Sequence, residues 1–578
     1  MGRVSQHTHG SGAPAMSQTD PAPPSAPPAP GSSAAPPVWP QALVGAVIGA
    51  AALGLGAFIL TRGGDLPDDP GTPTPPAAAM TVDPLAGWEK PAAAVVFTGE
   101  VHGYLEPCGC SEKQNGGVAR RSALFKELRE EKGWDVVAAD AGGTLRRTRL
   151  QSELKFAAMR RALEQMGYGL LNLGPEELRL GMDYLVQHVY DAPPLLGANV
   201  ALFGDVTGQT ANDTGIARTR ILEAGGLKIG FTGVVGATMA KELANPDPNS
   251  LIGVGDAADV LPLALEELAD CDVRVLLSQA EPDETTAFLQ NYPGFHVAVT
   301  AGGPEDPSAE PTVVATEAGD ALLLRVGHKG KHAGVVGVYP VEGSDRPQLT
   351  YALVTLSKDR FGHDESMDPI MAGYQQSIAD NLEAIFDDLP PAAPPRPGGY
   401  VGAAKCGECH TKAYAKWKES PHAHALASLT EGRENFEGDW ADRRLDPECL
   451  SCHVTGWDPQ GYYPFDGGYL PERLAAGSAG GGVDGTTGLS GMDRHLKLQS
   501  QQCENCHGPG SDHVAVFERF KADPASVDQA EQRAANKAMH IDLATASQTT
   551  CVKCHDGDNS PDFKFEEYWP KIAHPWRD

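Results

Sequence analysis

The feature that most constrains this chain is a pentapeptide, Cys-x-x-Cys-His, which occurs four times in the last third of the sequence. The four copies are Cys406/Cys409/His410, Cys449/Cys452/His453, Cys503/Cys506/His507 and Cys551/Cys554/His555. Two thiols at this spacing can add to the two vinyl groups of a porphyrin, and the adjacent imidazole can bind the iron, so the pattern is typical of c-type haem attachment. Zinc sites also use Cys-x-x-Cys pairs, but zinc does not require a His directly after each second Cys. The repetition therefore predicts four covalently attached haem c groups.

Length and charge narrow the classes of partner. A chain of 578 residues exceeds the size at which a single core stops growing, about 250–300 residues, so several domains are expected. The formal net charge is −30, from 46 basic and 76 acidic residues. This charge disfavours nucleic acid and favours redox partner proteins with basic docking surfaces. A homo-oligomer is compatible with the same sequence.

The first ninety residues contain a tail, an apolar segment and a spacer. Residues 1–40 are rich in Pro, Ala, Ser and Gly and predict a disordered tail. Residues 42–60 are apolar and uncharged, and at ~1.5 Å per residue they can just cross a hydrocarbon layer of ~30 Å. We expect a single transmembrane anchor here; a cleavable signal peptide is the alternative, but it would need a short basic leader. Residues 61–90 are a Pro-rich spacer. Because haem c is attached outside the cytoplasmic membrane, we expect a single-pass protein of the inner membrane with most of its chain in the periplasm.

Residues 91–358 alternate short apolar runs with helical stretches, which predicts an α/β layered domain. The expected buried strands are 93–98, 136–139, 170–173, 228–235, 273–278 and 297–300, and 150–167 is expected to be a helix. Residues 321–326 and 334–341 suggest an antiparallel finish. Residues 359–399 are expected to form a helix followed by a Pro-rich linker, and residues 400–578 the haem domain, mainly helical and irregular. The Gly-rich stretch 475–491 is interpreted as an insertion between the second and third haem sites.

Residues 95–121 (VVFTGEVHGYLEPCGCSEKQNGGVARR) resemble the start of the 5′-nucleotidase/UDP-sugar-hydrolase type of calcineurin-like metallophosphatase. The similarity extends over most of residues 93–340. It implies a four-layer α/β sandwich with two metal ions held at the strand ends.

The positions that this resemblance assigns to metal ligands are largely changed. Two-metal hydrolysis needs a bridging carboxylate and several further ligands. His102 is kept, Glu100 stands in place of an Asp, and Gly143 stands in place of a second Asp. The remaining ligand motifs are replaced by 174–177 (GPEE), 278–279 (SQ) and 300–305 (TAGGPE). We therefore expect a metallophosphatase-like domain that is not hydrolytic.

Three cysteines lie outside the haem motifs. Cys108 and Cys110 form a Pro-Cys-Gly-Cys element that resembles one found in a subgroup of hydrolase-like proteins. Such a pair could be an easily reduced disulfide, a thiol redox centre or part of a metal site, and a simple structural disulfide is the alternative. Cys271, at the edge of a predicted strand, is expected to be a small buried residue.

The haem domain resembles tetrahaem cytochromes c of the cytochrome c-554 type. The similarity is carried by residues 406–425 (CGECHTKAYAKWKESPHAHA), 503–513 (CENCHGPGSDH) and 551–574, and it covers most of residues 400–578. Within that pattern, His422, His513 and His574 occupy positions of distal iron ligands. Further candidates are His424, His495 and His540, while Met492 and Met539 are less favoured than a second His.

Two classes of function are compatible with these motifs. The first, which we favour, is an electron carrier that passes electrons between redox partners along its haems. The second is an enzyme, either a haem oxidoreductase acting on a small nitrogen or sulfur compound at a five-coordinate iron, or a middle domain with residual hydrolase or thiol-redox activity. Six candidate distal histidines for four irons favour the electron carrier.

Overall fold

Seven strands form the first of two large sheets, in the order β15-β14-β1-β2-β3-β4-β6. The computed structural model of the protein describes residues 83–107, 114–203, 206–207, 215–243, 252–432, 436–477 and 489–574. In the first sheet β1 (Ala93–Thr98), β2 (Val136–Asp140), β3 (Leu170–Asn172), β4 (Leu195–Leu196) and β6 (Ile216–Ala217) run parallel. The strand β14 (His332–Tyr339) is antiparallel to both β1 and β15 (Gln348–Thr355).

The second sheet has six strands in the order β12-β13-β11-β10-β8-β7. Its strands are β7 (Thr219–Ala224), β8 (Leu227–Val235), β10 (Val273–Gln279), β11 (Val297–Thr300), β12 (Thr312–Val314) and β13 (Ala321–Leu324). The four strands β8, β10, β11 and β13 are parallel neighbours, and the two edge strands pair antiparallel.

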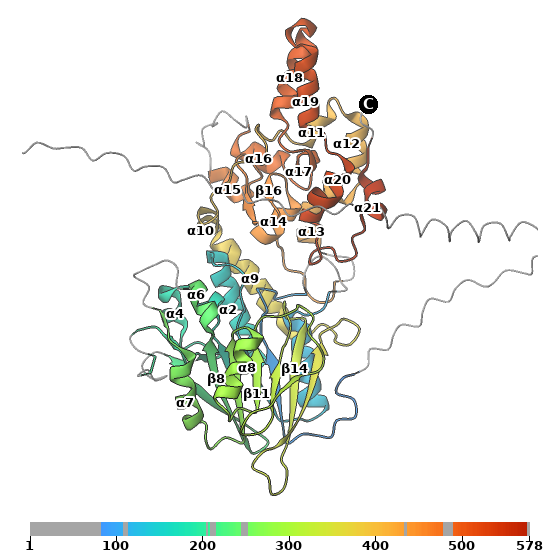
Figure 1. Cartoon of the computed structure of the whole chain (residues 1–578). Coiled ribbons are helices and arrows are strands. Elements are labelled where there is room, and N and C mark those ends of the chain that lie inside the picture. Colours follow the sequence, from blue (N-terminus) through green and yellow to red (C-terminus); the bar gives the residue numbers. More distant parts are fainter. Residues whose placement is uncertain are drawn as a thin grey trace, which may run out of the picture. The chain divides into compact units, whose positions relative to one another are not determined.

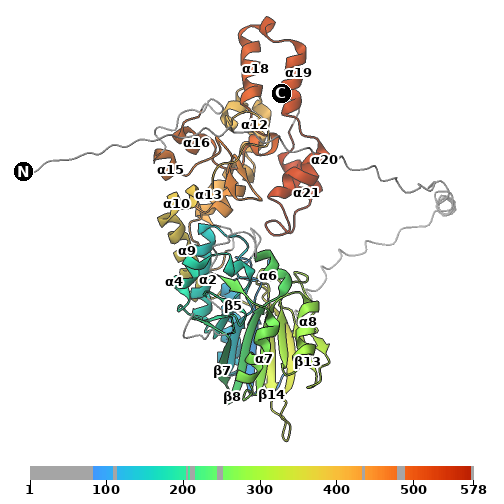
Figure 2. The same cartoon turned by 60° about the vertical axis from the view of Figure 1, so that its left-hand side comes forward.

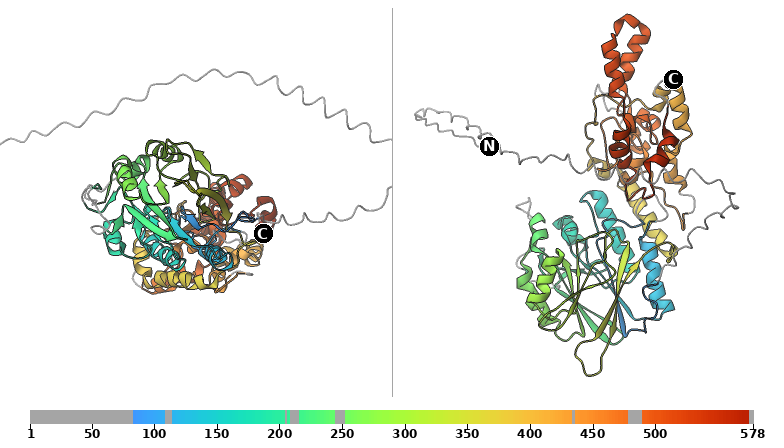
Figure 3. Two further views of the ribbon diagram at one scale, coloured as in Figure 1. Left: turned by 90° about the horizontal axis from the view of Figure 1, so that it is seen from below. Right: turned by 45° about the vertical axis from the view of Figure 1, so that its right-hand side comes forward.

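The two sheets stack face to face between two layers of helices (Figure 3). Val95 and Phe97 of β1 pack toward the second sheet, against Phe231 and Val275. Their neighbours Ala94 and Val96 point to the other face, where α1 (Val118–Lys126), α2 (Leu150–Gln165) and α9 (Asp368–Asp380) cover the first sheet. On the far side, α7 (Ala257–Glu267) and α8 (Pro282–Asn291) cover the second sheet. Because both faces of β1 are buried, the strand is a continuous apolar run. Its side chains point alternately to the two faces, and so they enter two different cores.

The structure has the four-layer α/β sandwich that the sequence resemblance predicted. The predicted strands of both sheets are present, and the predicted helix at 150–167 is α2. The predicted antiparallel finish is wrong in one respect: residues 321–326 and 334–341 do not pair with each other, because β13 belongs to the second sheet and β14 to the first. The antiparallel partner of β14 is instead β15.

The C-terminal part is built from short helices around few apolar side chains (Figures 1 and 2). Its elements are α11 (Ala403–Gly407), α12 (Thr411–Lys418), α13 (Ala425–Glu431), α14 (Pro447–His453), β16 (Trp457–Asp458), β17 (Tyr463–Pro464), α15 (Glu472–Gly477), α16 (Gly491–Lys497), α17 (Cys503–His507), α18 (Ser511–Ala522), α19 (Gln529–Ala538), α20 (Leu543–Thr545) and α21 (Phe565–Ile572). Figure 2 shows α18 and α19 as an antiparallel hairpin, and Arg519 bonds Glu531 across it.

The segment 359–399 ties the α/β part to the C-terminal part. Ile378 of α9 is fully buried in the core beneath α2, and Phe386 of α10 (Leu382–Asp387) packs edge-on against Trp457, with the ring centroids 5.6 Å apart. Residues 80–578 accordingly form one compact unit. The predicted tail, membrane anchor and most of the spacer lie outside the described residues, as does most of the predicted insertion at 475–491. Within the described part of the chain, no helix is long and apolar enough to cross a membrane.

Candidate functional site

Each of the four pentapeptides lies at or beside a helical turn. The second and third motifs are within α14 and α17, the first spans the end of α11 and the start of α12, and the fourth begins in a 3-10 turn, Cys551–Lys553. A helical turn brings residues three positions apart onto one face, so the two thiols of a motif can reach one porphyrin edge.

None of the eight motif cysteines forms a disulfide with another described cysteine. Cys409 differs from the other thiol of its motif: it is exposed, whereas Cys406 is half-buried. The physical reason is its place in the chain, because Cys409 follows the end of α11, in the turn that leads into α12. The bond of Cys409 to a haem vinyl group stays a prediction.

Three of the motif histidines face a second histidine from elsewhere in the sequence. The ring centroids are 6.2 Å apart for His410 and His513, 6.1 Å for His555 and His422, and 5.9 Å for His507 and His574. A metal–imidazole bond is about 2 Å long, so two imidazoles on opposite sides of one iron hold their centroids about 6 Å apart. The three predicted distal ligands therefore lie where an iron bound to the first, fourth and third motifs would need them, and these residues fit the group.

The other ring nitrogen of three of these six histidines meets an oxygen atom. The Nδ1 atom of His507 lies 2.6 Å from the Met539 carbonyl, and that of His513 lies 3.2 Å from the Ala535 carbonyl. Nδ1 of His555 lies 3.0 Å from the Ser560 hydroxyl. A proton on Nδ1 leaves Nε2 as the lone-pair donor for a metal. Burial also lowers the pKa of four of these imidazoles, which favours the neutral form that binds iron: His422, His507, His513 and His555.

The second motif has a different surrounding. Nδ1 of His453 lies 2.6 Å from the Ala425 carbonyl, which directly follows the candidate ligand His424. The other candidate, His495, has its Nδ1 3.1 Å from the Leu470 carbonyl and its ring 5.6 Å from that of Tyr469. The structure thus brings three of the predicted distal histidines to motif histidines and leaves the ligand roles of His424, His495 and His540 as predictions.

The thiols show which motifs are neighbours. The neighbouring thiol of Cys503 in the third motif is the main cause that raises the pKa of Cys406 in the first, and Cys452 of the second motif likewise raises the pKa of Cys554 in the fourth, so each pair of side chains lies close together. The first and third haem sites are therefore adjacent, and so are the second and fourth.

In the α/β part, Glu100 fills the space of a missing carboxylate. A β-carbon added to Gly143 would lie 2.4 Å from Glu100 Oε1, so no side chain fits at position 143 while Glu100 keeps its place. The same oxygen accepts a hydrogen bond from Gln279 Nε2 at 3.0 Å, and Glu100 Oε2 lies 3.3 Å from His102 Nε2. Glu is one methylene longer than the Asp that the resemblance expects, and this length carries its carboxylate into the gap at Gly143.

Hydrogen bonds within the chain occupy the rest of this cleft. Glu177 is fully buried and accepts hydrogen bonds from the Thr144 amide at 2.6 Å and the Gly174 amide at 2.8 Å. Burial, followed by the charges of Glu177 and Glu100, raises the pKa of Glu176 to about 7. Among the described residues, no group of three or more His, Cys, Asp or Glu side chains could hold a metal ion.

Sequence reasoning missed one residue of the cleft, His328. Its ring lies 5.1 Å from that of His102, between centroids, and its Nε2 is buried without a hydrogen-bond partner. The available signal was its position between Gly327 and Gly330, just beyond a predicted strand. Cys108 and Cys110 lie outside the described residues, so their redox role stays a prediction. Cys271 is buried, as predicted.

Comparison with known proteins divides the chain in the same way. Residues 405–468 match the family model described as cytochrome c554 and c-prime. Cytochrome c-554 of Nitrosomonas europaea is 27% identical over 167 residues, which are 27% of this chain and 57% of the relative. The chain thus spans little more than half the length of this curated relative, and the similarity lies in the cytochrome.

Solved structures resemble the α/β part. A 5′-nucleotidase precursor from Thermus thermophilus is 21% identical with a TM-score of 0.43, over 50% of this chain and 60% of that one. The NAD nucleotidase of Haemophilus influenzae is 18% identical with a TM-score of 0.41, over 57% and 68%. The sulfate thiohydrolase SoxB of Thermus thermophilus is 13% identical with a TM-score of 0.42, over 72% and 82%. TM-scores below 0.5 are too low to assign an activity.

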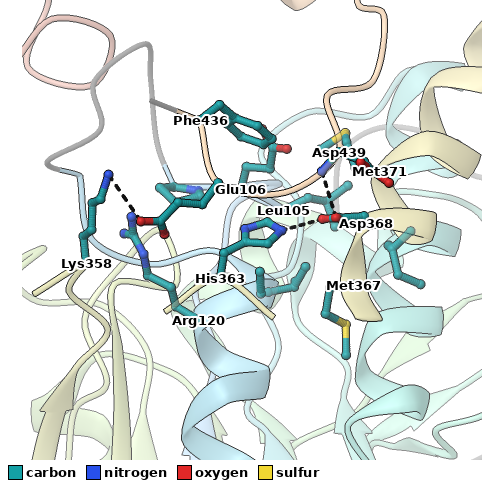
Figure 4. Close-up of a pocket in the computed structure, with 15 residues that line it drawn as sticks. Leu105, Glu106, Arg120, Lys358, His363, Met367, Asp368, Met371, Phe436 and Asp439 are labelled. Atoms are coloured by element: carbon teal, nitrogen blue, oxygen red, sulfur yellow. Dashed lines mark hydrogen bonds and ion pairs between the residues drawn. The ribbon is translucent and has the colours of Figure 1, made fainter. Parts of the chain in front are cut away.

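A small cavity of about 70 Å³ lies between the loop at Leu105–Pro107, helix α9 and residues 436–439 (Figure 4). Its charged side chains have partners within the chain. Glu106 pairs with Arg443 at 2.6 Å, Lys358 with Glu437 at 3.6 Å, and Asp368 accepts the Asp439 amide at 2.9 Å. Because these charges are already compensated, the cavity is better described as a packing gap than as a ligand site.

Proposed function

We propose that this chain is a membrane-anchored periplasmic tetrahaem c-type cytochrome that transfers electrons between redox partners. The observation that carries the proposal is the set of three His–His pairs at 5.9–6.2 Å, each joining a motif histidine to a distant one. Haem c supplies a one-electron iron couple when bound. An imidazole on each side of an iron leaves no position for a substrate, which favours electron transfer over catalysis at those three sites.

The arrangement of the motifs supports a route for electrons. The close approach of Cys406 to Cys503 and of Cys452 to Cys554 makes the first site a neighbour of the third, and the second a neighbour of the fourth. Desolvation raises the pKa of the Cys506 thiol, with the charge of Cys551 as the second cause. The third motif therefore lies near the fourth, and we expect the four sites to form a continuous series, as a carrier requires.

The α/β part is proposed to be non-hydrolytic. A bridging carboxylate at position 143 is absent, Glu100 accepts a hydrogen bond from Gln279, and Glu177 accepts one from the Thr144 amide. We expect the purified chain to hydrolyse no nucleotide with Mn²⁺ present. Manganese-stimulated release of phosphate from a nucleoside monophosphate, lost in the variant Glu100→Gln, would contradict this proposal.

Haem counting and low-temperature EPR test the cytochrome proposal. We expect four haems per chain by the pyridine haemochrome method and at least three low-spin ferric signals. The variant His513→Ala should convert one low-spin signal to high-spin, because the iron of the first motif loses one imidazole, whereas His188→Ala, an exposed pair with Asp191 in the α/β part, should convert none. An unchanged low-spin count in His513→Ala would contradict the ligand assignment. A high-spin signal in the parent protein that shifts on adding hydroxylamine or sulfite would favour the alternative, a haem oxidoreductase.

A further inference from the structure

The short loop after the fourth haem motif is held by side chains of the α/β part. This loop, residues 556–560, begins directly after the motif histidine His555. Tyr104 Oη donates to Asp558 Oδ2 at 3.0 Å, and Lys329 Nζ forms an ion pair with Asp558 Oδ1. Gln114 Nε2 donates to the carbonyls of Gly557 and Asp558, at 3.1 and 3.0 Å. Three residues of the α/β part therefore converge on two consecutive residues of the cytochrome.

The loop transmits these contacts to His555. Asp556 Oδ1 accepts hydrogen bonds from the backbone amides of Asp558 and Asn559, at 3.0 and 2.7 Å, which makes the loop a compact turn. The Ser560 amide donates to the Asp556 carbonyl at 2.9 Å, and the Ser560 hydroxyl lies 3.0 Å from His555 Nδ1. Asp558, which bonds to the α/β part, and Ser560, which contacts the imidazole of His555, thus belong to one hydrogen-bonded turn.

A second bridge reaches the same motif from another direction. Arg147 Nη2 donates to the Gln460 carbonyl at 2.8 Å. Gln460 Nε2 in turn donates to the carbonyl of Lys553, inside the fourth motif, at 2.6 Å and approaches Asp556 Oδ2 at 3.3 Å. Two independent contacts on one motif distinguish this junction from a general packing surface.

Charge at the first bridge is only partly exposed. The Lys329 and Asp558 side chains are 15% and 22% exposed. Lys329 also pairs with Glu305 at 2.6 Å, so its ammonium group is fixed between two carboxylates. Charges held in a partly buried site are weakly screened and act on a nearby redox centre over several ångströms.

We infer that the α/β part positions His555 and sets the electrostatic environment of the fourth haem through a clamp made of Tyr104, Gln114 and Lys329 on Asp558. This inference rests on the proposed function, because it takes His555 as an iron ligand. The clamp gives the α/β part a role in this chain, which is to tune the fourth haem site. Lys329, Tyr104 and Gln114 are positioning residues and do not contact the iron.

Two single variants with opposite charge effects test the clamp in the full haem-loaded chain. Lys329→Gln leaves the negative charge of Asp558 less compensated, which stabilises the ferric state and should lower the reduction potential of the fourth haem. Asp558→Asn removes that negative charge and should raise the potential, and the double variant should lie between the two. A role limited to structural support would shift both single variants in the same direction, so opposite signs identify the electrostatic clamp.

The potential is read by EPR-monitored redox titration. The signal of the fourth haem is identified as the low-spin signal that disappears in His422→Ala. The control is Arg473→Gln, which removes an exposed ion pair with Glu383 between the same two parts of the chain and should shift no potential. Tyr104→Phe removes one hydroxyl and keeps the ring. It provides a second test of the clamp if the Lys329 variant does not fold, and it should also lower the potential. Shifts of equal sign in Lys329→Gln and Asp558→Asn, or no shift in any of the clamp variants, would overturn the inference. Fewer than four haems in the parent protein would instead refute the proposed function.

Discussion

At the scale of single residues, the three assigned distal histidines reach their positions from three different local structures. His422 lies in a 3-10 turn, Pro421–His424, His513 lies in the first turn of α18, and His574 follows the end of α21. Their spacing from the motifs differs in each case, so no periodic pattern in the sequence predicts the pairing. The resemblance to cytochrome c-554 proteins predicted which histidines are ligands, and the structure pairs each of the three with one motif histidine.

Glu176 is the residue for which a pH effect can be predicted. Its pKa is about 7 in the folded chain against an ordinary value of 4.5, so between pH 4.5 and 7 the folded state binds the proton more tightly than the unfolded state. Folding stability should therefore fall as pH rises through this window, by roughly 1–3 kcal/mol, and the loss should be complete above pH 7. Glu176→Gln, which stays neutral, should melt at a higher temperature than the parent at pH 8 and equally at pH 4.5.

Thermal unfolding followed by circular dichroism at several pH values measures this difference. Glu317→Gln, at an exposed loop position, is the matched control and should give parallel curves at every pH. If Glu176→Gln also ran parallel to the parent, the carboxyl would be ionised in the folded state and the explanation from burial would be wrong.

At the scale of elements, the sequence predicted regular structure better than the contacts between elements. Buried strands such as β1 and β10 are apolar runs in the sequence because both of their faces are covered, and their bounds follow closely from composition. The partners of β13 and β14 did not follow, because strand pairing depends on which sheet each strand joins and not on its own residues. Helix α9 was predicted as part of a connecting segment, yet Ile378 is buried in the main core.

Glu100 and Gly143, in the loops after β1 and β2, lie against each other, and this coupling can be measured. Gly143→Asp should destabilise the chain by about 1–3 kcal/mol, because its β-carbon would meet Glu100 Oε1 and because Gly143 has a φ of 70°. Glu100→Asp shortens the opposing side chain and should recover part of that loss in the double variant. A double-mutant cycle from chemical denaturation should give a coupling energy of about 0.5–3 kcal/mol. Strictly additive effects would show that the two positions do not compete for the same space.

At the scale of the whole molecule, packing joins two folds that the sequence predicted to be separated by a helix and a Pro-rich linker. A buried carboxylate, Asp446, caps the helix of the second motif and also accepts hydrogen bonds from Gln151 and Gln375 of the α/β part, at 2.8 and 2.9 Å. Side chains of this kind are polar residues scattered through the sequence, and their burial is not visible until both folds are in place. Composition predicted two folds, but it could not predict their dependence on each other.

The net charge of −30 is a property of the whole chain. It leads to a prediction about how salt affects electron transfer to a basic partner. A cationic acceptor is drawn toward such a surface, and the attraction weakens as the Debye length falls from about 30 Å at 0.01 M salt to about 8 Å at 0.15 M. The second-order rate of electron transfer from the reduced protein to a basic c-type cytochrome should therefore fall about tenfold or more over this range. Ferricyanide, an anion, should show the opposite trend with the same donor, since screening relieves its repulsion. Stopped-flow mixing at several salt concentrations measures both rates. A rate to the basic cytochrome that is independent of salt would mean that the negative charge lies away from the site where electrons leave, and the proposal of a basic docking partner would fail.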